Sequence, residues 1–232
     1  MTKPVAIMLG IGAAGLLCAA GAAASAREGA PLASAFLAWS ALGCLAVGGA
    51  YALNRPGVYG KRDGVIPAGR ALLLGPFLLA FWAAWGLRNL LRPQPRYHLV
   101  SPGLWVGARV PAAELPPGVD VVVDLTSELW EPRAIRQMPG YYGFPVLDGF
   151  HPRDEEAFLE LVAEVAAAPG SIYVHCESGR GRAPTMAALL LLARGVVDSP
   201  EAALELVQKR RPTAAPGRRD VAFVRRLARR LR

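Results

Sequence analysis

The sequence predicts an α/β domain with a central, mainly parallel sheet flanked by helices, preceded by two or three transmembrane helices. Two observations support this. Of the 232 residues, 53% are hydrophobic, and long apolar stretches are concentrated in the N-terminal part. In the C-terminal part, short β-branched runs alternate with helical patterns. We therefore expect a membrane domain over residues 1–92, a linker over 93–96 and a globular domain over 97–232.

Three N-terminal stretches, at about 5–26, 32–53 and 71–91, are candidates for membrane spans. The first two carry no charge and are long enough to cross a bilayer. The third is slightly short, is rich in aromatic residues, and contains Gly75-Pro76, which favours a kink. The alternatives are three spans, or two spans with an interfacial third segment. A cleaved signal peptide is the competing interpretation of the first stretch, but the other two would then remain.

The globular domain contains clear secondary-structure patterns. Residues 171–174 are β-branched and apolar, which predicts a buried strand, and Val121-Val122-Val123 is also interpreted as a strand. Residues 154–168 predict a helix that has acidic residues in its first turn and an apolar face, and Pro169-Gly170 ends it. Residues 200–210 predict another helix. The tail from 218 to 232 predicts a basic amphipathic helix that closes the domain, binds anionic lipid, or does both.

The most informative segment lies between the strand at 171–174 and an apolar helix that begins near Ala183. A strand, a tight glycine loop and a helix N-terminus aim successive backbone N–H groups at one point, where an anion with several oxygens would fit. Pro184 is tolerated in the first helical turn. The residues expected to bind this anion are Glu177, Ser178, Gly179, Arg180, Gly181 and Arg182.

Cys176 stands at the base of this loop. Loop amides, the helix N-terminus and a nearby arginine all favour the thiolate form of its side chain. Arg182 offers a planar fork that can hold two phosphate oxygens at once. The expected reaction is in-line attack of Cys176 on phosphorus, which gives a phosphocysteine that water then hydrolyses. We expect no metal or other cofactor, because Arg182 and the amides carry the charge of the transferring group.

His175-Cys176-x5-Arg182 resembles the signature of Cys-dependent protein tyrosine phosphatases, and its surroundings resemble the dual-specificity branch. The resemblance runs from about Tyr97 to near the C-terminus and implies a dual-specificity-phosphatase-like fold. The stretch 173–188 is also similar to the mitochondrial lipid-phosphatase branch, whose substrate is phosphatidylglycerophosphate.

The resemblance also implies roles for other residues. Residues 144–149 look like the segment that carries the general acid, which would be Asp148. Asp124 is the alternative carboxylate, with a structural or loop-anchoring role favoured for it. His175 is expected to support the loop rather than act as a base. Glu177 places a negative charge where heavily phosphorylated inositol lipids would favour Lys.

Two positions depart from the family pattern. Many members have Ser or Thr directly after the signature arginine, where the hydroxyl helps the thiolate to leave, but this chain has Ala183. Slow turnover of the phosphoenzyme is therefore expected. In the lipid-phosphatase branch a Gln follows the Pro-Gly near the C-terminus, whereas here Arg218 follows Pro216-Gly217, which weakens the substrate analogy.

The function predicted from these features is a membrane-anchored phosphomonoesterase, with a phospholipid headgroup such as phosphatidylglycerophosphate as the favoured substrate. The alternative is a protein tyrosine or dual-specificity phosphatase that acts on membrane-proximal phosphoproteins. A third alternative is a catalytically weak phosphate-binding module. A sulfurtransferase-like use of the Cys loop is disfavoured by the position of Arg182 and by the upstream Asp148.

The formal net charge of +8 does not indicate nucleic acid, because the basic residues flank the apolar stretches and fill the tail. The expected partners are the bilayer and a phosphorylated lipid or phosphoprotein. Glycines in the first stretch would also permit a homodimer through the spans. A reactive thiol is best kept in a reducing compartment, so we expect an integral protein of the inner or plasma membrane with a cytoplasmic catalytic domain.

Overall fold

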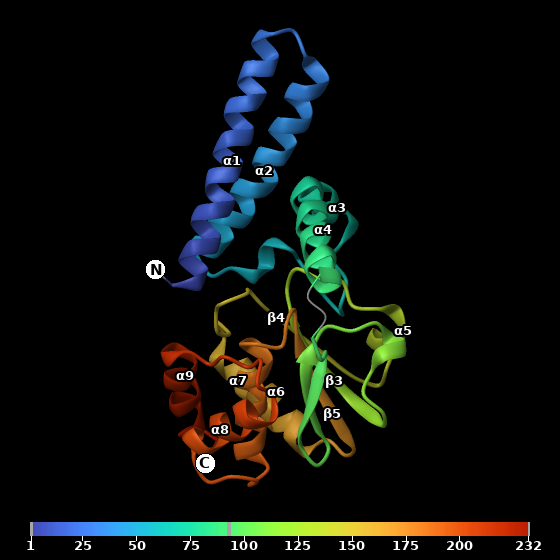
Figure 1. Cartoon of the computed structure of the whole chain (residues 1–232), viewed down its shortest axis with the longest axis vertical. Coiled ribbons are helices and arrows are strands. Elements are labelled where there is room, and N and C mark those ends of the chain that lie inside the picture. Colours follow the sequence, from blue (N-terminus) through green and yellow to red (C-terminus); the bar gives the residue numbers. More distant parts are fainter. Residues whose placement is uncertain (1, 92–93, 232) are drawn as a thin grey trace. The chain divides into compact units, whose positions relative to one another are not determined.

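The computed structural model describes residues 2–91 and 94–231, and the chain divides into two compact units, Met1–Gln94 and Pro95–Arg232. The first unit begins with a helical hairpin of α1 (Lys3–Arg27) and α2 (Pro31–Ala52), coloured blue in Figure 1. Gly29 joins them with a φ of +73°. Among the described helices, these two are long and apolar enough to cross a membrane. Apolar side chains such as Leu16, Leu17 and Leu32 are exposed along them.

Glycines let the two helices approach closely. A Cβ atom on Gly15 would lie 2.9 Å from Leu45 Cγ, and one on Gly48 would lie 3.4 Å from the backbone nitrogen of Gly12. Gly15 and Gly21, two of the glycines that suggested a dimer, therefore face α2 within one chain. Whether the spans also associate between chains stays a prediction.

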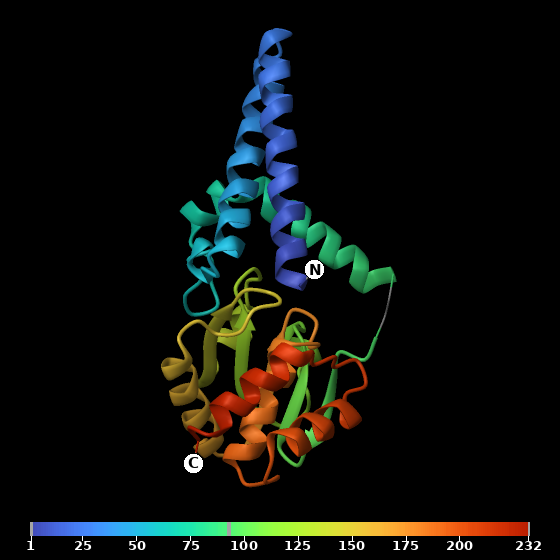
Figure 2. The ribbon, with the colours of Figure 1, turned by 90° about the vertical axis from the view of Figure 1, so that its left-hand side faces the viewer.

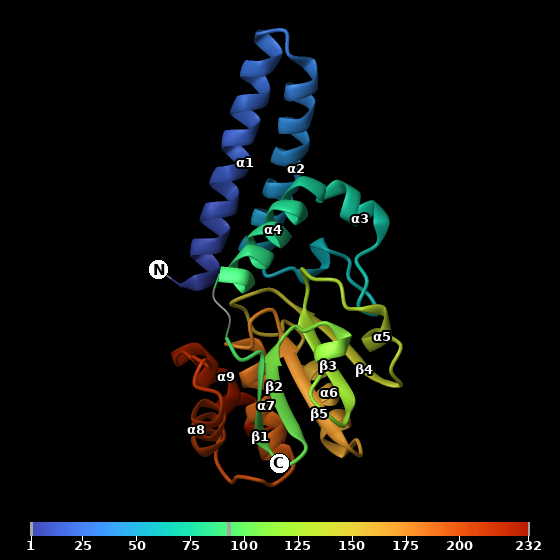
Figure 3. The same cartoon turned by 45° about the vertical axis from the view of Figure 1, so that its right-hand side comes forward.

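The predicted third stretch is divided. After the 3-10 turn η1 (Pro56–Val58), a short helix α3 (Ala68–Leu73) ends just before α4 (Gly75–Leu91), as Figure 3 shows. The break falls at the Gly75-Pro76 pair, as expected for a proline that cannot continue the hydrogen-bond ladder. Trp39 Nε1 on α2 donates to the carbonyl oxygens of Leu72 and Leu73 at 3.0 and 3.2 Å. The 17 residues of α4 lie at the short end of the range for a full span, so the number of spans stays a prediction.

The second unit contains a five-stranded sheet in the order β1-β2-β5-β3-β4. Its strands are β1 (Tyr97–Ser101), β2 (Leu104–Ala108), β3 (Val119–Thr126), β4 (Gly140–Val146) and β5 (Ser171–Cys176). β1 runs antiparallel to β2, and every other pair is parallel, so the predicted mainly parallel sheet is confirmed. The register pairs Cys176 with Ala108 and His175 with Asp124, which brings the carboxyl ends of β2, β3 and β5 to one edge.

Helices cover one face of this sheet. They are α6 (Glu155–Ala167), α7 (Arg182–Ala193), α8 (Pro200–Arg210) and α9 (Arg218–Ala228), coloured yellow to red in Figures 1 and 2. Alternate strand residues such as Val123 and Val174 join their apolar core. The opposite face holds a smaller cluster that includes Val122, Tyr173 and Ile135 of the short α5 (Arg133–Arg136). The turn η2 (Ala112–Glu114) precedes β3.

The basic tail forms the expected amphipathic helix, and its apolar stripe closes the domain. Phe223, Val224 and Leu227 of α9 are buried in the main core. On its charged face, Arg225 pairs with Glu201, Arg226 with Glu155, and Arg230 with Glu155 and Glu156. The acidic first turn of α6 therefore neutralises part of the charge of the basic tail. Together with the buried apolar stripe, these ion pairs support the interpretation that the tail closes the domain.

Candidate active site

The loop between β5 and α7, residues 176–182, wraps around the sulfur of Cys176 and is called the Cys176 loop below. Cys176 ends β5 and is 2% exposed, and Arg182 begins α7. The backbone N–H of Gly179 donates to Cys176 Sγ at 3.3 Å. An amide aimed at the sulfur stabilises a negative charge there. The carbonyl oxygen of Cys176 accepts from the Arg109 amide at 2.8 Å, which anchors the end of the strand.

Gly179 fits this loop for two reasons. Its φ is +66°, a conformation that costs glycine little, and a Cβ atom there would lie 2.4 Å from the carbonyl carbon of Gly107 on β2. The loop is therefore packed directly against the neighbouring strand, and no larger residue fits without moving backbone.

The six residues expected to bind an anion all lie in the Cys176 loop, and they differ in exposure. Glu177 and Gly179 are buried, Ser178 and Gly181 are half-buried, and Arg180 is exposed. Ala183 is fully buried and supplies no hydroxyl beside the loop. The hydroxyl of Thr185 donates to the Gly181 carbonyl at 2.9 Å within its own helix.

The guanidinium of Arg182 is almost completely buried. Nη1 donates to the carbonyl oxygens of Val146 (2.6 Å) and Leu125 (3.2 Å), at the ends of β4 and β3. Nη2 and Nη1 also donate to the carboxylate of Glu128 at 2.8 and 3.3 Å. Burial disfavours the charge on Arg182, but Glu128 and Asp148 outweigh it and raise its pKa well above the usual value. Arg182 is therefore a fixed cation.

Glu128 was not predicted from the sequence as a site residue. It follows the carboxyl end of β3 and is itself held by Ser127, whose N–H and hydroxyl donate to Oε2 at 2.9 and 2.8 Å. The sequence did contain a signal for it. Glu128 follows one parallel strand, β3, and the Cys176 loop follows its neighbour, β5, so both lie at the carboxyl-terminal edge of the sheet. Glu128 orients the arginine and balances its buried charge.

Asp148 lies in a tight turn after β4. The turn is closed by a hydrogen bond from the Phe150 amide to the Leu147 carbonyl (3.1 Å), and Gly149 has a φ of +81°. The Asp148 carboxylate lies 3.6 Å from Arg182 Nη2, and its side chain is 27% exposed. The structure therefore brings Asp148 to the site with one side open to solvent, as a group that exchanges protons requires.

Asp124, the alternative carboxylate, is buried and engaged elsewhere. It accepts from the Thr126 amide and hydroxyl at 2.8 and 2.7 Å, and from the Tyr141 hydroxyl at 3.0 Å. These bonds support the structural role expected for it. His175 beside it is also buried, with Nε2 3.7 Å from Glu131 Oε1.

Asp124, Glu131 and His175 form a buried group whose side chains could in principle hold a metal ion. Arg109 Nε, however, lies 3.5 Å from Glu131 Oε2, so a cation already sits beside this carboxylate. The oxygens of Asp124 are engaged by Thr126 and Tyr141. The group therefore fits an internal hydrogen-bonding and ion-pair network better than a metal site.

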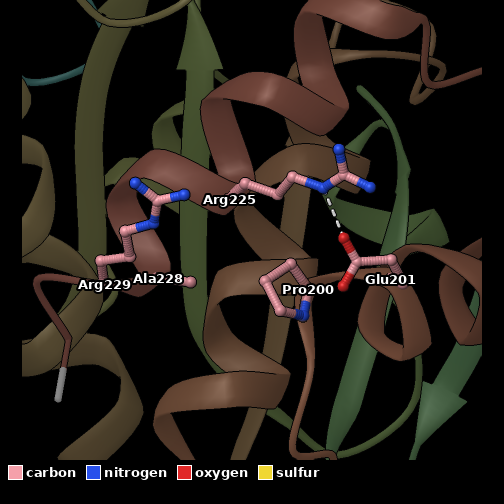
Figure 4. A pocket seen from close by; sticks show the side chains of 5 residues that line it. All are labelled: Pro200, Glu201, Arg225, Ala228 and Arg229. Carbon is pink, nitrogen blue, oxygen red and sulfur yellow. Dashed lines mark hydrogen bonds and ion pairs between the residues drawn. The ribbon is translucent and has the colours of Figure 1, made fainter.

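A second hollow lies between α8 and the C-terminal end of α9. Pro200, Glu201, Arg225, Ala228 and Arg229 line it, and Figure 4 shows Arg225 donating to Glu201 there. None of these residues belongs to the Cys176 loop, so this hollow is separate from the candidate active site.

A family model and several solved structures are similar to the second unit of the chain. Residues 112–230 match the family model described as "PTP-SAK: Swiss Army Knife protein, DSP-PTPase phosphatase domain". A search of curated proteins found no match. Human DUSP28 is 24% identical over 59% of this chain and 97% of its own, with a TM-score of 0.46. PTPMT1 in complex with PI(5)P is 20% identical to this chain, with 59% of this chain and 97% of PTPMT1 covered and a TM-score of 0.48. Tk-PTP in its active form is 22% identical to this chain, with 59% of this chain and 97% of Tk-PTP covered and a TM-score of 0.48.

Proposed function

The chain belongs to the DSP-PTPase phosphatase domain family, and on this premise we propose that it hydrolyses a phosphomonoester on a phospholipid headgroup, through a phosphocysteine at Cys176. Phosphatidylglycerophosphate is the proposed substrate type. The same site would serve a protein tyrosine or dual-specificity phosphatase, and the experiment below separates the two.

The proposed first step is attack of the Cys176 thiolate on phosphorus, in line with the leaving oxygen. The S–P bond forms as the P–O bond to the alcohol breaks, and Asp148 gives its proton to the departing oxygen. In the second step Asp148 takes a proton from water, which attacks the phosphocysteine and releases phosphate and the thiolate. Arg182 and the loop amides hold the phosphoryl oxygens in both steps.

One observation carries this assignment. Within residues 2–91 and 94–231, Arg182 Nε is a buried donor that has no hydrogen-bond partner, although both terminal nitrogens of the same guanidinium are bonded. Leaving a buried donor unmatched costs free energy. Cys176 ends β5 and Arg182 begins α7, so the two residues stand at the two ends of one short loop. A phosphoryl oxygen on Cys176 would supply the missing acceptor.

Asp148→Asn tests the general acid. We expect kcat to fall by roughly 10²-fold on an alkyl phosphate, whose leaving group needs a proton. The loss should be much smaller on p-nitrophenyl phosphate, whose leaving group needs none. Steady-state rates of both substrates across the pH range measure this. Asp198→Asn, the same change at an exposed carboxylate after α7, is the control. Equal loss on both substrates, or no loss on either, would rule out Asp148 as the acid.

The choice of a lipid rests on the first unit. The exposed apolar faces of α1 and α2 suit a bilayer. Only residues 92–96 separate the end of α4 from the start of β1. A short tether raises the effective concentration of membrane-borne substrates. We also assign the phosphatase unit to the cytoplasmic side, where a thiolate is protected from oxidation.

A phosphate-release panel in detergent tests the substrate. We expect kcat/KM for phosphatidylglycerophosphate to exceed that for soluble phosphotyrosine peptides by at least about tenfold in mixed micelles. Phosphorylated inositol lipids should be poorer than phosphatidylglycerophosphate, because the buried Glu177 adds negative charge to the loop. Cys176→Ser gives the background for each substrate. Equal or faster release from the peptides would favour the protein phosphatase instead.

A further inference from the structure

Three peptide units of the Cys176 loop are held from behind by the segment that follows α8. This segment, residues 211–215, is called the brace below. Arg211 Nη2 donates to the Ser178 carbonyl at 3.1 Å, and Arg211 Nε donates to the Gly179 carbonyl at 2.7 Å. The amide of Ala215 donates to the Arg180 carbonyl at 3.0 Å. Three consecutive carbonyl groups therefore point toward the brace.

The direction of these carbonyls fixes the direction of the next amides. A trans peptide unit is planar, so its N–H points opposite to its C=O. The N–H groups of Gly179, Arg180 and Gly181 must then point away from the brace. For the first of them the target is observed, because the Gly179 N–H donates to Cys176 Sγ. The brace therefore turns the amide donors toward the sulfur.

Arg211 is an unusual residue for this task. It is 2% exposed, and its third hydrogen bond joins Nη1 to His98 Nδ1 on β1 at 3.0 Å. In the described part of the chain, its partners are these two carbonyls and one ring nitrogen, with no ion pair to a carboxylate. A buried cation without an anionic partner is costly. Burial lowers the pKa of Arg211, whereas the nearby Tyr173 and Cys176 act to raise it.

The geometry points to Arg211 as a positioning residue of the phosphatase reaction. It holds the Ser178 and Gly179 carbonyls on the far side of the loop, so that the following amides face the thiolate and the phosphoryl group. This inference rests on the proposed function of Cys176, and it adds a residue that does not itself touch the substrate.

The test uses the full chain in detergent with Arg211→Met and Arg211→Lys. Mass spectrometry of the Cys176 peptide follows its alkylation by iodoacetamide against pH, with and without inorganic phosphate. We expect Arg211→Met to slow alkylation of Cys176 by roughly tenfold near neutral pH, because the loop amides are no longer held toward the sulfur. Protection by phosphate should weaken by roughly tenfold or more. Arg211→Lys should fall between, because one ammonium cannot serve both carbonyls in this geometry.

Arg194→Met is the matched control. Arg194 is half-buried and, like Arg211, donates to two carbonyls, those of Ala166 and Ala168 at the end of α6, at 3.1 and 3.2 Å. Its loss should change thermal stability and leave the alkylation profile unchanged. The inference would be overturned if Arg211→Met lowered the melting temperature as Arg194→Met does but kept wild-type alkylation and wild-type phosphate protection.

Two further outcomes are also decisive. If both Arg211 variants unfold, Ala215→Pro removes the amide that holds Arg180 and keeps the Arg211 side chain, and a wild-type alkylation profile in that variant would reject the brace. Failure of the proposed function would look different, because wild-type Cys176 itself would then show neither phosphate protection nor phosphate release. Protection in the wild type that is equally strong in Arg211→Met would contradict the brace alone.

Discussion

Cys176→Ser is expected to lower phosphate release by at least about 10³-fold, because a serine hydroxyl in this loop is a far weaker nucleophile than a thiolate. Binding of inorganic phosphate should persist, since the amides and Arg182 remain in place. Cys18→Ser and Cys44→Ser are matched controls, because they make the same change in α1 and α2. Both controls should retain wild-type rates of phosphate release.

The intermediate gives an independent check. Acid quenching of wild-type enzyme during turnover should trap a phosphoryl group on the Cys176 peptide, detected by mass spectrometry. Because Ala183 offers no hydroxyl to assist the leaving thiolate, the adduct should accumulate. Phosphate release without any adduct on Cys176, or undiminished release by Cys176→Ser, would contradict the covalent mechanism.

Arg182→Lys is expected to lower kcat/KM by roughly 10²- to 10³-fold. The guanidinium binds Glu128 and two strand-end carbonyls while its Nε remains for the phosphoryl group. A lysine ammonium is a point charge and cannot fill all of these positions at once. Both a rise in KM and a fall in kcat should appear, since the interaction holds the substrate and the transition state.

Arg194→Lys controls for the substitution itself, because this arginine lies at the end of α7 and binds the carbonyls of Ala166 and Ala168, away from the Cys176 loop. It should retain wild-type kinetics. Wild-type kcat/KM in Arg182→Lys, with the fold intact by circular dichroism, would show that the arginine does not bind the phosphoryl group.

The local features of the fold were predictable because they depend on neighbouring residues. The β-branched run before Cys176 predicted β5, and the helix predicted at 154–168 is α6 at Glu155–Ala167. The helix predicted at 200–210 is α8 with the same bounds. The break near Gly75-Pro76 also came from local chemistry. The signature segment similarly predicted a cysteine at the end of a strand, a short loop of backbone amides after it, and an arginine at the start of the next helix.

The partners of Arg182 and of the loop could not be predicted in this way. Glu128 is 54 residues away from Arg182 along the chain, and Arg211 is 32 residues away from Gly179. Neither residue stands in a recognisable motif with its partner. In the sequence, Arg211 looks like the other arginines of the basic tail. In the structure it differs from them because it is buried against the Cys176 loop. The apolar stripe of α9 allowed two interpretations until its contacts were known.

The sequence by itself determined that a thiol, a glycine loop and an arginine fork form one strand–loop–helix unit, because backbone connectivity and local steric preference suffice to build it. Only the tertiary structure decided which distant groups hold that unit in place. Parallel strands bring Glu128 and Asp148 to the same sheet edge, and the end of α8 brings Arg211 behind the loop. Such contacts depend on how the sheet and helices pack, which no short stretch of residues encodes.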